Sequence, residues 1–106
     1  MARAYKNAKV DLTSTDVTAL YTCPSITVAI VTSILVSEDS GNADTITVTL
    51  TNAATAVFSL YKVKAVSANT TVELLTRPLV VQESEILKVK AATADRLHVV
   101  ASLLEL

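Results

Sequence analysis

The stretch that decides the fold is TITVTLT, Thr45 to Thr51, in which apolar and polar residues alternate without interruption. Successive side chains of an extended chain point to opposite faces, so Ile46, Val48 and Leu50 share one face and the threonines share the other. The stretch therefore predicts a β-strand with one buried face. It follows the strongest turn signal in the chain, EDSGNAD, which holds the only glycine.

The rest of the chain repeats this pattern. Val and Thr occur fifteen times each, against one Gly and two Pro, and β-branched residues favour strands. The predicted strands are residues 17–22, 27–37, 45–51, 56–66, 71–76, 79–81, 86–92 and 97–106. Within 56–66 the apolar residues change face, which indicates a bulge. Eight or nine short strands at this spacing predict an all-β, antiparallel β-sandwich, jelly-roll-like first and immunoglobulin-like second.

A chain of 106 residues is sufficient for one domain with its own core. We expect residues 10–106 to form that single β-sandwich domain and residues 1–9 to form an N-terminal arm. The arm shows no clear apolar face and is locally basic. Its residues that would reach a partner are Arg3, Tyr5, Lys6 and Lys9.

Composition argues against several classes of protein. The net charge is −1 with no basic block, which disfavours a nucleic-acid binder. Aromatic residues are 4% of the chain and Trp is absent, which disfavours stacking on bases or sugars. No apolar run is long enough for a membrane span, and no secretory signal is visible. We therefore expect that the protein is synthesised in a cytoplasm and that neither a membrane nor a nucleic acid is its partner.

The residues that could carry chemistry are few. His98 is the only histidine and Cys23 the only cysteine, which leaves a multi-ligand metal site without donors. Glu38, Asp39 and Asp44 around Gly41 are the best calcium candidates, but a solvated turn explains them more simply. No nucleophile elbow or phosphate loop is present. We therefore expect a protein that is not an enzyme, with no catalytic residues, no metal and no cofactor.

The last strand, LHVVASLLEL, has one apolar face too many. Leu97, Val99 and Leu103 can fill a core, yet Val100, Leu104 and Leu106 on the opposite face are also apolar. An exposed patch of this kind marks an interaction site, and a terminal strand is often a sheet edge. We expect a subunit interface here, made by His98, Val100, Leu104 and Leu106. The alternative is a central strand that the N-terminal arm covers.

Three stretches resemble a group of small virion proteins of tailed bacteriophages, whose members look like head decoration (cement) proteins or other accessory structural parts. They are VDLTSTDVTALYTCP (10–24), AIVTSILVSEDSGNADTITVTL (29–50) and SANTTVELLTRPLVVQESEILKVKAATADRLHVVASLLEL (67–106). Where those relatives often carry Gly-Asp before the penultimate strand, this chain has Ser84-Glu85.

The resemblance implies a structural virion protein on the outer surface of the capsid. Such a protein forms homo-oligomers, here expected to be trimers, binds the major capsid protein and stabilises contacts between its subunits. The arm residues Arg3, Tyr5, Lys6 and Lys9 are then expected to contact the capsid. The alternatives are a tail, baseplate or fibre component and, from another class, a module that binds sugar or calcium.

Overall fold

The structure, a computed structural model, describes residues 3–106 and contains nine strands and no helix in that range. The strands are β1 (Ala4–Asp11), β2 (Thr18–Thr22), β3 (Ala29–Glu38), β4 (Asp44–Thr51), β5 (Val57–Val66), β6 (Thr71–Glu73), β7 (Leu79–Val81), β8 (Ile86–Ala91) and β9 (Leu97–Glu105). Every pair of neighbouring strands is antiparallel. The predicted all-β fold of antiparallel sheets is confirmed.

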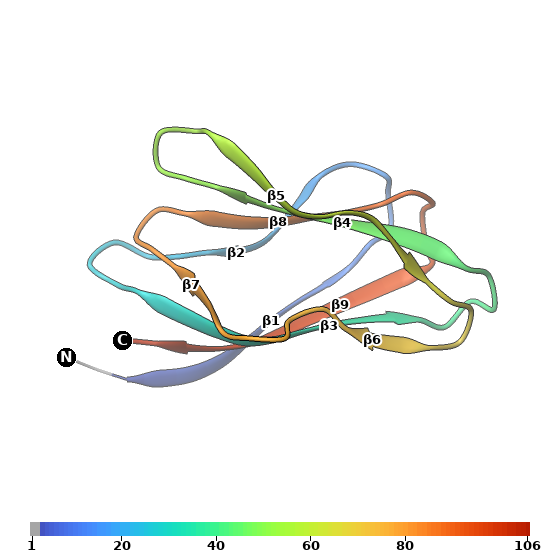
Figure 1. Ribbon diagram of the computed structural model, residues 1–106, viewed down its shortest axis with the longest axis horizontal. Helices are drawn as coiled ribbons and strands as arrows, with labels where there is room; N and C mark the ends of the chain where they lie inside the picture. The colour runs from blue at the N-terminus through green and yellow to red at the C-terminus, as the bar shows by residue number, and fades with distance from the viewer. Residues whose placement is uncertain (1–2) are drawn as a thin grey trace.

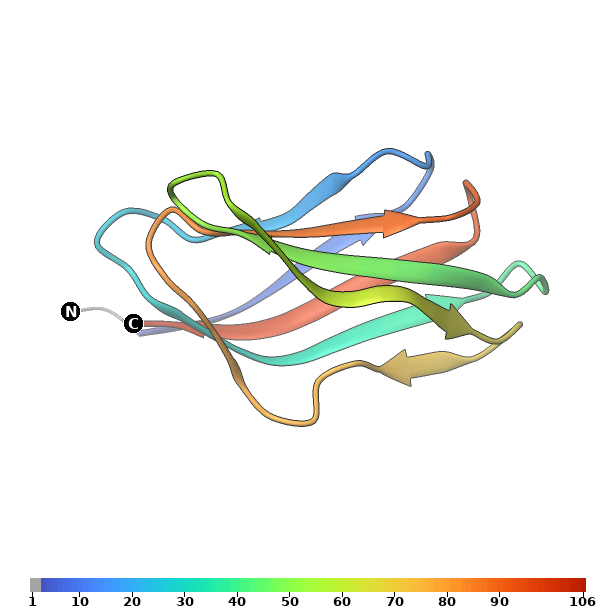
Figure 2. The same ribbon diagram turned by 45° about the horizontal axis from the view of Figure 1, so that its top comes forward.

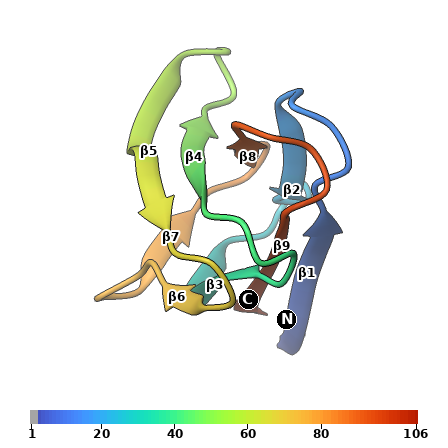
Figure 3. The ribbon, with the colours of Figure 1, turned by 90° about the vertical axis from the view of Figure 1, so that its right-hand side faces the viewer.

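The strands form two sheets that pack face to face (Figure 1). Sheet A has five strands in the order β1-β9-β3-β6, with β7 also paired with β3, and sheet B has four in the order β2-β8-β4-β5. Figure 3 looks along the molecule and shows β4, β8 and β2 above β3, β9 and β1. The two layers are those of a β-sandwich.

The strand pairs are nested like the two arms of one long hairpin. The innermost pair is β4 with β5, followed by β3 with β6 and β7, then β2 with β8, and finally β1 with β9. This nested order is the one expected of a jelly-roll-like sandwich.

The core lies between the sheets and takes alternate residues from each strand. On β9 the inward residues Leu97, Val99, Ala101 and Leu103 are at most 2% exposed. They face Ile46 and Val48 of the alternating stretch, which belong to the same buried cluster and are 0% exposed. The choice of inner face for both strands is therefore as predicted from alternation.

The N-terminal segment differs from the expectation of an arm. Residues 4–9 lie in β1, which pairs residue by residue with β9 from Ala4–Glu105 to Asp11–His98. The expected arm is thus the edge strand of sheet A, because its backbone finds a complete hydrogen-bonding partner in β9. Met1 and Ala2, also assigned to the arm, lie outside the described residues.

The last strand is central, contrary to the expectation of an edge. β9 lies between β1 and β3 over its whole length (Figure 2). The alternative reading, a central strand beside a folded-back N-terminal segment, is therefore partly realised. The segment pairs with the side of β9, however, and does not lie over its outward face.

The expected bulge in residues 56–66 is present. The register between β4 and β5 shifts twice, between Ile46 and Val48 and between Val48 and Thr49. Val63 sits at the first shift with a positive φ of 54°, and its backbone N–H donates to Thr47 Oγ1 at 3.1 Å. This local change of direction explains why no single alternation fits the segment.

Candidate interaction surface

Four of the residues predicted for the interface and for the arm, Tyr5, Lys9, Val100 and Leu104, lie on one surface, the outer face of sheet A. In the β1–β9 register Tyr5 is opposite Leu104, and Lys9 is opposite Val100. Directly opposite residues of an antiparallel pair have neighbouring side chains on the same face. Two sites that the sequence presents as separate are therefore a single surface.

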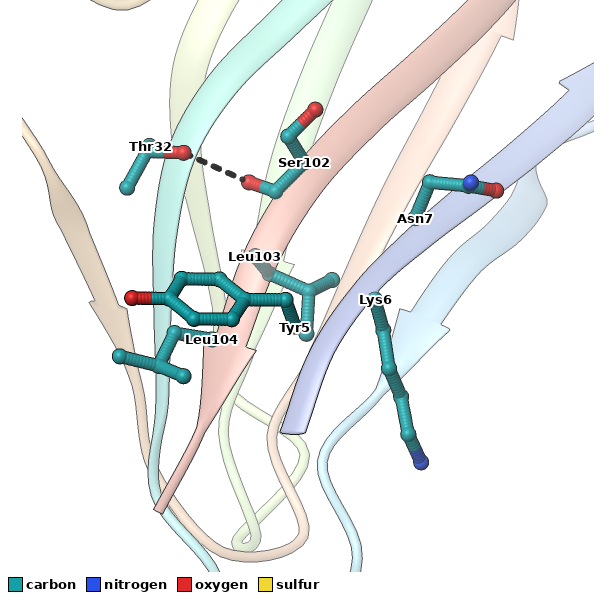
Figure 4. Close-up of a pocket in the computed structure, with 7 residues that line it drawn as sticks. All are labelled: Tyr5, Lys6, Asn7, Thr32, Ser102, Leu103 and Leu104. Carbon is teal, nitrogen blue, oxygen red and sulfur yellow. Dashed lines mark hydrogen bonds between the residues drawn. The ribbon is translucent and has the colours of Figure 1, made fainter. Parts of the chain in front are cut away.

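An apolar row crosses this face from edge to edge. Tyr5 pairs with Leu104, Leu104 pairs with Ile30 of β3, and Ile30 pairs with Val80 of β7. Tyr5 is 87% exposed and Val80 is 50% exposed. Figure 4 shows the ring of Tyr5 beside Leu104. Both residues line a shallow groove of about 380 Å³ together with Thr32 and Ser102.

A second row runs parallel to the first and crosses β9 at Val100, four residues before Leu104. Lys9 pairs with Val100, Val100 pairs with Leu35, and Leu35 pairs with Glu73 of β6. Val100 is 36% exposed and Leu35 is 40% exposed. This row is apolar in the middle and charged at both ends, so it supplies a polar margin to the surface.

Between the two rows the face is polar. Thr32 and Ser102 are exposed, and Thr32 Oγ1 donates to the backbone oxygen of Ser102 at 3.2 Å. The register of β3 against β9 shifts here, between Val31 and Ser33. The carboxylate of Glu73 accepts from the backbone N–H of Ile34 at 2.8 Å and from Ser33 Oγ, which holds the irregular segment in place.

His98 closes one end of the outer face. Its Nε2 lies 3.2 Å from Asp11 Oδ1, and its Nδ1 lies 3.6 Å from Asp39 Oδ2. The two carboxylates flank opposite nitrogens of the ring, so they do not converge on one point. No group of three or more His, Cys, Asp or Glu within residues 3–106 is arranged to hold a metal ion.

The calcium candidates around Gly41 have other partners. Glu38 is 2% exposed and accepts from the backbone N–H groups of Ser40, Gly41 and Asn69 at 3.0 to 3.2 Å, and from Ser40 Oγ. Asp44 is also buried and accepts from the N–H of Thr93 at 3.1 Å. Both carboxylates are used to hold backbone, which is a structural role.

Lys6 and Glu105 lie beside the outer face rather than on it. Lys6 Nζ is 2.8 Å from Glu105 Oε1, and Tyr21 of β2 donates its hydroxyl to Glu105 Oε2 at 2.5 Å. The hydrogen bonds from Lys6 and Tyr21 lower the pKa of Glu105, while burial and the bond to Glu105 raise the pKa of Tyr21. This cluster ties sheet A to sheet B, so Lys6 already has a partner within the chain.

The remaining predicted residues fall at the ends of the strands. Leu106 is half-buried, and its backbone exchanges hydrogen bonds with Val28. Arg3 is exposed immediately before β1. Cys23 is 1% exposed, and burial raises the pKa of its thiol. Within residues 3–106 no helix is long and apolar enough to cross a membrane.

The residues that the sequence did not assign to this surface are Ile30, Leu35 and Val80. For Ile30 and Leu35 a signal was present, since residues 27–37 carry apolar side chains on both faces of a predicted strand; Val80 lies in the short predicted strand 79–81 and had no such signal. The missing information was the register, which decides that these side chains continue the rows of β9 rather than form a patch elsewhere.

Comparison with known proteins gives a fold and no family. No family model matches the chain, and no curated protein matches it. A solved structure described as "Bacillus endospore appendages form a novel family of disulfide-linked pili" is similar over 97% of this chain and 86% of its own, with 8% identity and a TM-score of 0.57. At that identity the likeness is one of fold.

Two further solved structures are more distant. A pentameric capsid protein isolated from metagenomic phage sequences has 19% identity over 93% of this chain and 59% of its own, with a TM-score of 0.48. A structure of infectious bursal disease virus, Gt strain, has 9% identity over 99% of this chain and 30% of its own, with a TM-score of 0.43. The chain thus spans about three fifths of the phage capsid protein that it matches.

Proposed function

We propose that this protein is a structural component of a tailed-phage virion, and specifically a capsid decoration protein. It assembles into a homo-oligomer, by resemblance a trimer, binds the major capsid protein on the outer surface of the head and stabilises contacts between capsid subunits. It has no catalytic role. The virion assignment rests on the resemblance carried by residues 10–24, 29–50 and 67–106.

The observation that carries the assembly role is the outer face of sheet A. Its apolar row, Tyr5, Leu104, Ile30 and Val80, is continuous across four strands. Covering apolar surface stabilises an assembly by ~25 cal/mol for each Å² removed from water. Self-association through this face is the simplest way to cover it. A decoration protein that binds only the assembled capsid lattice then stabilises that lattice by mass action.

Leu104→Asp is expected to dissociate the oligomer and leave the subunit folded. Leu104 lies in the middle of the apolar row and is partly exposed, so a carboxylate there stays hydrated in the free subunit but is desolvated in the interface. Light scattering should give the mass of one chain, and circular dichroism should remain that of a β-protein. Val57→Asp, at an exposed valine of β5 in sheet B, is the matched control, and an unchanged mass for Leu104→Asp contradicts the interface.

The capsid contact is a second part of the same proposal. Arg3, Tyr5, Lys6 and Lys9 are the residues expected to reach the capsid, and Tyr5 and Lys9 share the outer face of sheet A with Leu104 and Val100. Decoration requires hundreds of copies per particle, whereas a tail, baseplate or fibre part requires six to a few dozen. Gel densitometry of purified particles separates the two, and a low copy number would refute decoration.

A further inference from the structure

The outer face of sheet B carries a different character from that of sheet A. Its strands contain four lysines, Lys62 and Lys64 on β5 and Lys88 and Lys90 on β8. Their one acidic residue, Asp44, is 7% exposed and bonded to the N–H of Thr93. Elsewhere the chain holds five basic and nine acidic residues. The charge of a nearly neutral protein is therefore strongly divided between its faces.

Three of the four lysines, Lys62, Lys88 and Lys90, lie around Thr47 in the middle of the sheet, whereas Lys64 is opposite the core-facing Ile46 at the sheet edge. Leu87, Val89 and Ala91 of β8 are buried, so Lys88 and Lys90 between them point outward. Lys90 is directly opposite Thr47 of β4, whose hydroxyl on the other side accepts from the N–H of Val63. Lys62 and Lys64 flank Val63, about two strand spacings, ~10 Å, from Lys90.

These lysines are free of internal partners. Within residues 3–106 none of the four lies within ion-pair distance of a carboxylate, whereas Lys6 is paired with Glu105. The outward neighbours on β4 are Thr45, Thr47 and Thr49, which add hydroxyls and no bulk. The surface is thus a basic sheet face bordered by threonines, and its charge is available to a second molecule.

We propose that the outer face of sheet B docks on an acidic protein surface. The face is about four strands, ~20 Å, wide. A long nucleic acid would extend beyond it onto the acidic remainder of the molecule, where it would be repelled. An anionic membrane would need apolar side chains to insert among the basic ones. The exposed apolar residues of this sheet, Val57, Phe58 and Val63, all lie on its edge strand β5, while the outward positions of β4 and β8 offer threonine and lysine. A carboxylate-rich protein surface of similar size matches the face in both charge and extent.

The inference is independent of self-association through sheet A and is tested separately. The probe is a short fluorescein-labelled poly-L-glutamate, titrated with the full chain at low and high salt and followed by anisotropy. We expect the protein to bind poly-L-glutamate at low salt and to lose this binding at high salt. Lys90→Glu should weaken it about threefold and Lys62→Glu with Lys90→Glu about tenfold, because each exposed pair contributes a modest amount.

Arg77→Glu is the matched control, since Arg77 is exposed outside sheet B and its reversal changes the net charge equally. It should leave the affinity for poly-L-glutamate within a factor of two. Equal weakening by Arg77→Glu, or no binding at low salt, overturns the proposal. So does tighter binding of a DNA duplex or of phosphatidylglycerol vesicles. Light scattering of the same variants shows whether self-association is intact, so failure here is distinguishable from failure of the sheet A interface.

Discussion

Leu103→Ala is expected to lower the free energy of unfolding by about 2 to 5 kcal/mol. Leu103 is 2% exposed and points from β9 into the core, so truncation removes buried methyl groups and leaves a cavity between the sheets. Chemical denaturation followed by circular dichroism measures the change, which should appear as a lower midpoint at an unchanged slope.

The neighbouring Leu104→Ala supplies the contrast. Leu104 is partly exposed on the opposite face of β9, so its truncation should cost less than ~1.5 kcal/mol in the free subunit. Val99 and Val100 repeat the comparison, since Val99 is 0% exposed and Val100 is 36% exposed. If Leu103→Ala and Leu104→Ala are equally destabilising under conditions where the chain is monomeric, the assignment of the two faces is wrong.

Glu38→Gln is expected to lower the midpoint of thermal unfolding by about 4 to 8 °C. The carboxylate of Glu38 accepts hydrogen bonds from Ser40, Gly41 and Asn69 and thereby joins the turn after β3 to the turn after β5. An amide has one oxygen where the carboxylate has two, so its NH₂ group would face backbone N–H donors. Asp39→Asn in the same turn is the control and should change the midpoint little, because Asp39 is exposed.

The same carboxylate predicts a dependence on pH. Burial raises the pKa of Glu38, but the hydrogen bonds from Ser40, Asn69 and Gly41 outweigh it and hold the pKa at about 2, against an ordinary value of 4.5. A lowered pKa in the folded state stabilises the fold above pH 4.5, and that contribution is lost as the pH falls toward 2. The wild type should therefore lose more stability than Glu38→Gln between these values in thermal melts. Parallel curves would contradict this role of Glu38.

Most of the strands could be predicted from local pattern. Thr45–Thr51 and Ile86–Ala92 alternate over a core that selects one face, and the strands β4 and β8 follow them within a residue or so. The choice is local because a shift of one residue would expose the whole apolar set. The bulge of β5 could also be predicted, because the apolar residues change face partway along residues 56–66.

The first strand could not be predicted in this way. Residues 4–11 alternate between small, polar and basic side chains, and an edge strand needs only one partner. What makes the segment a strand is the long-range pairing with β9, whose residues lie 87 (Asp11–His98) to 101 (Ala4–Glu105) positions away in sequence. The same pairing makes β9 central, so the error about the arm and the error about the edge are one error.

The candidate site, too, was predictable where it depends on local pattern and not where it depends on pairing between distant strands. The apolar character of Val100 and Leu104 is visible in the sequence, and so is the basic character of Lys88 and Lys90. Their grouping is not, since Tyr5, Ile30 and Val80 join Leu104 only through three separate strand pairings. Registers between distant strands are a property of the assembled core, which selects them jointly.

The nested strand pairs have a consequence for the order of folding. The β4–β5 hairpin closes a short loop, whereas the β1–β9 pair joins Ala4 to Glu105 and must overcome the largest loss of chain entropy. We infer that β1 docks last, and that until then β9 presents an open, apolar edge to other nascent chains. Pulse-labelled hydrogen exchange should protect the amides of Thr47 and Thr49 before those of Ala8 and Val10. The reverse order would show that the outer pair forms first.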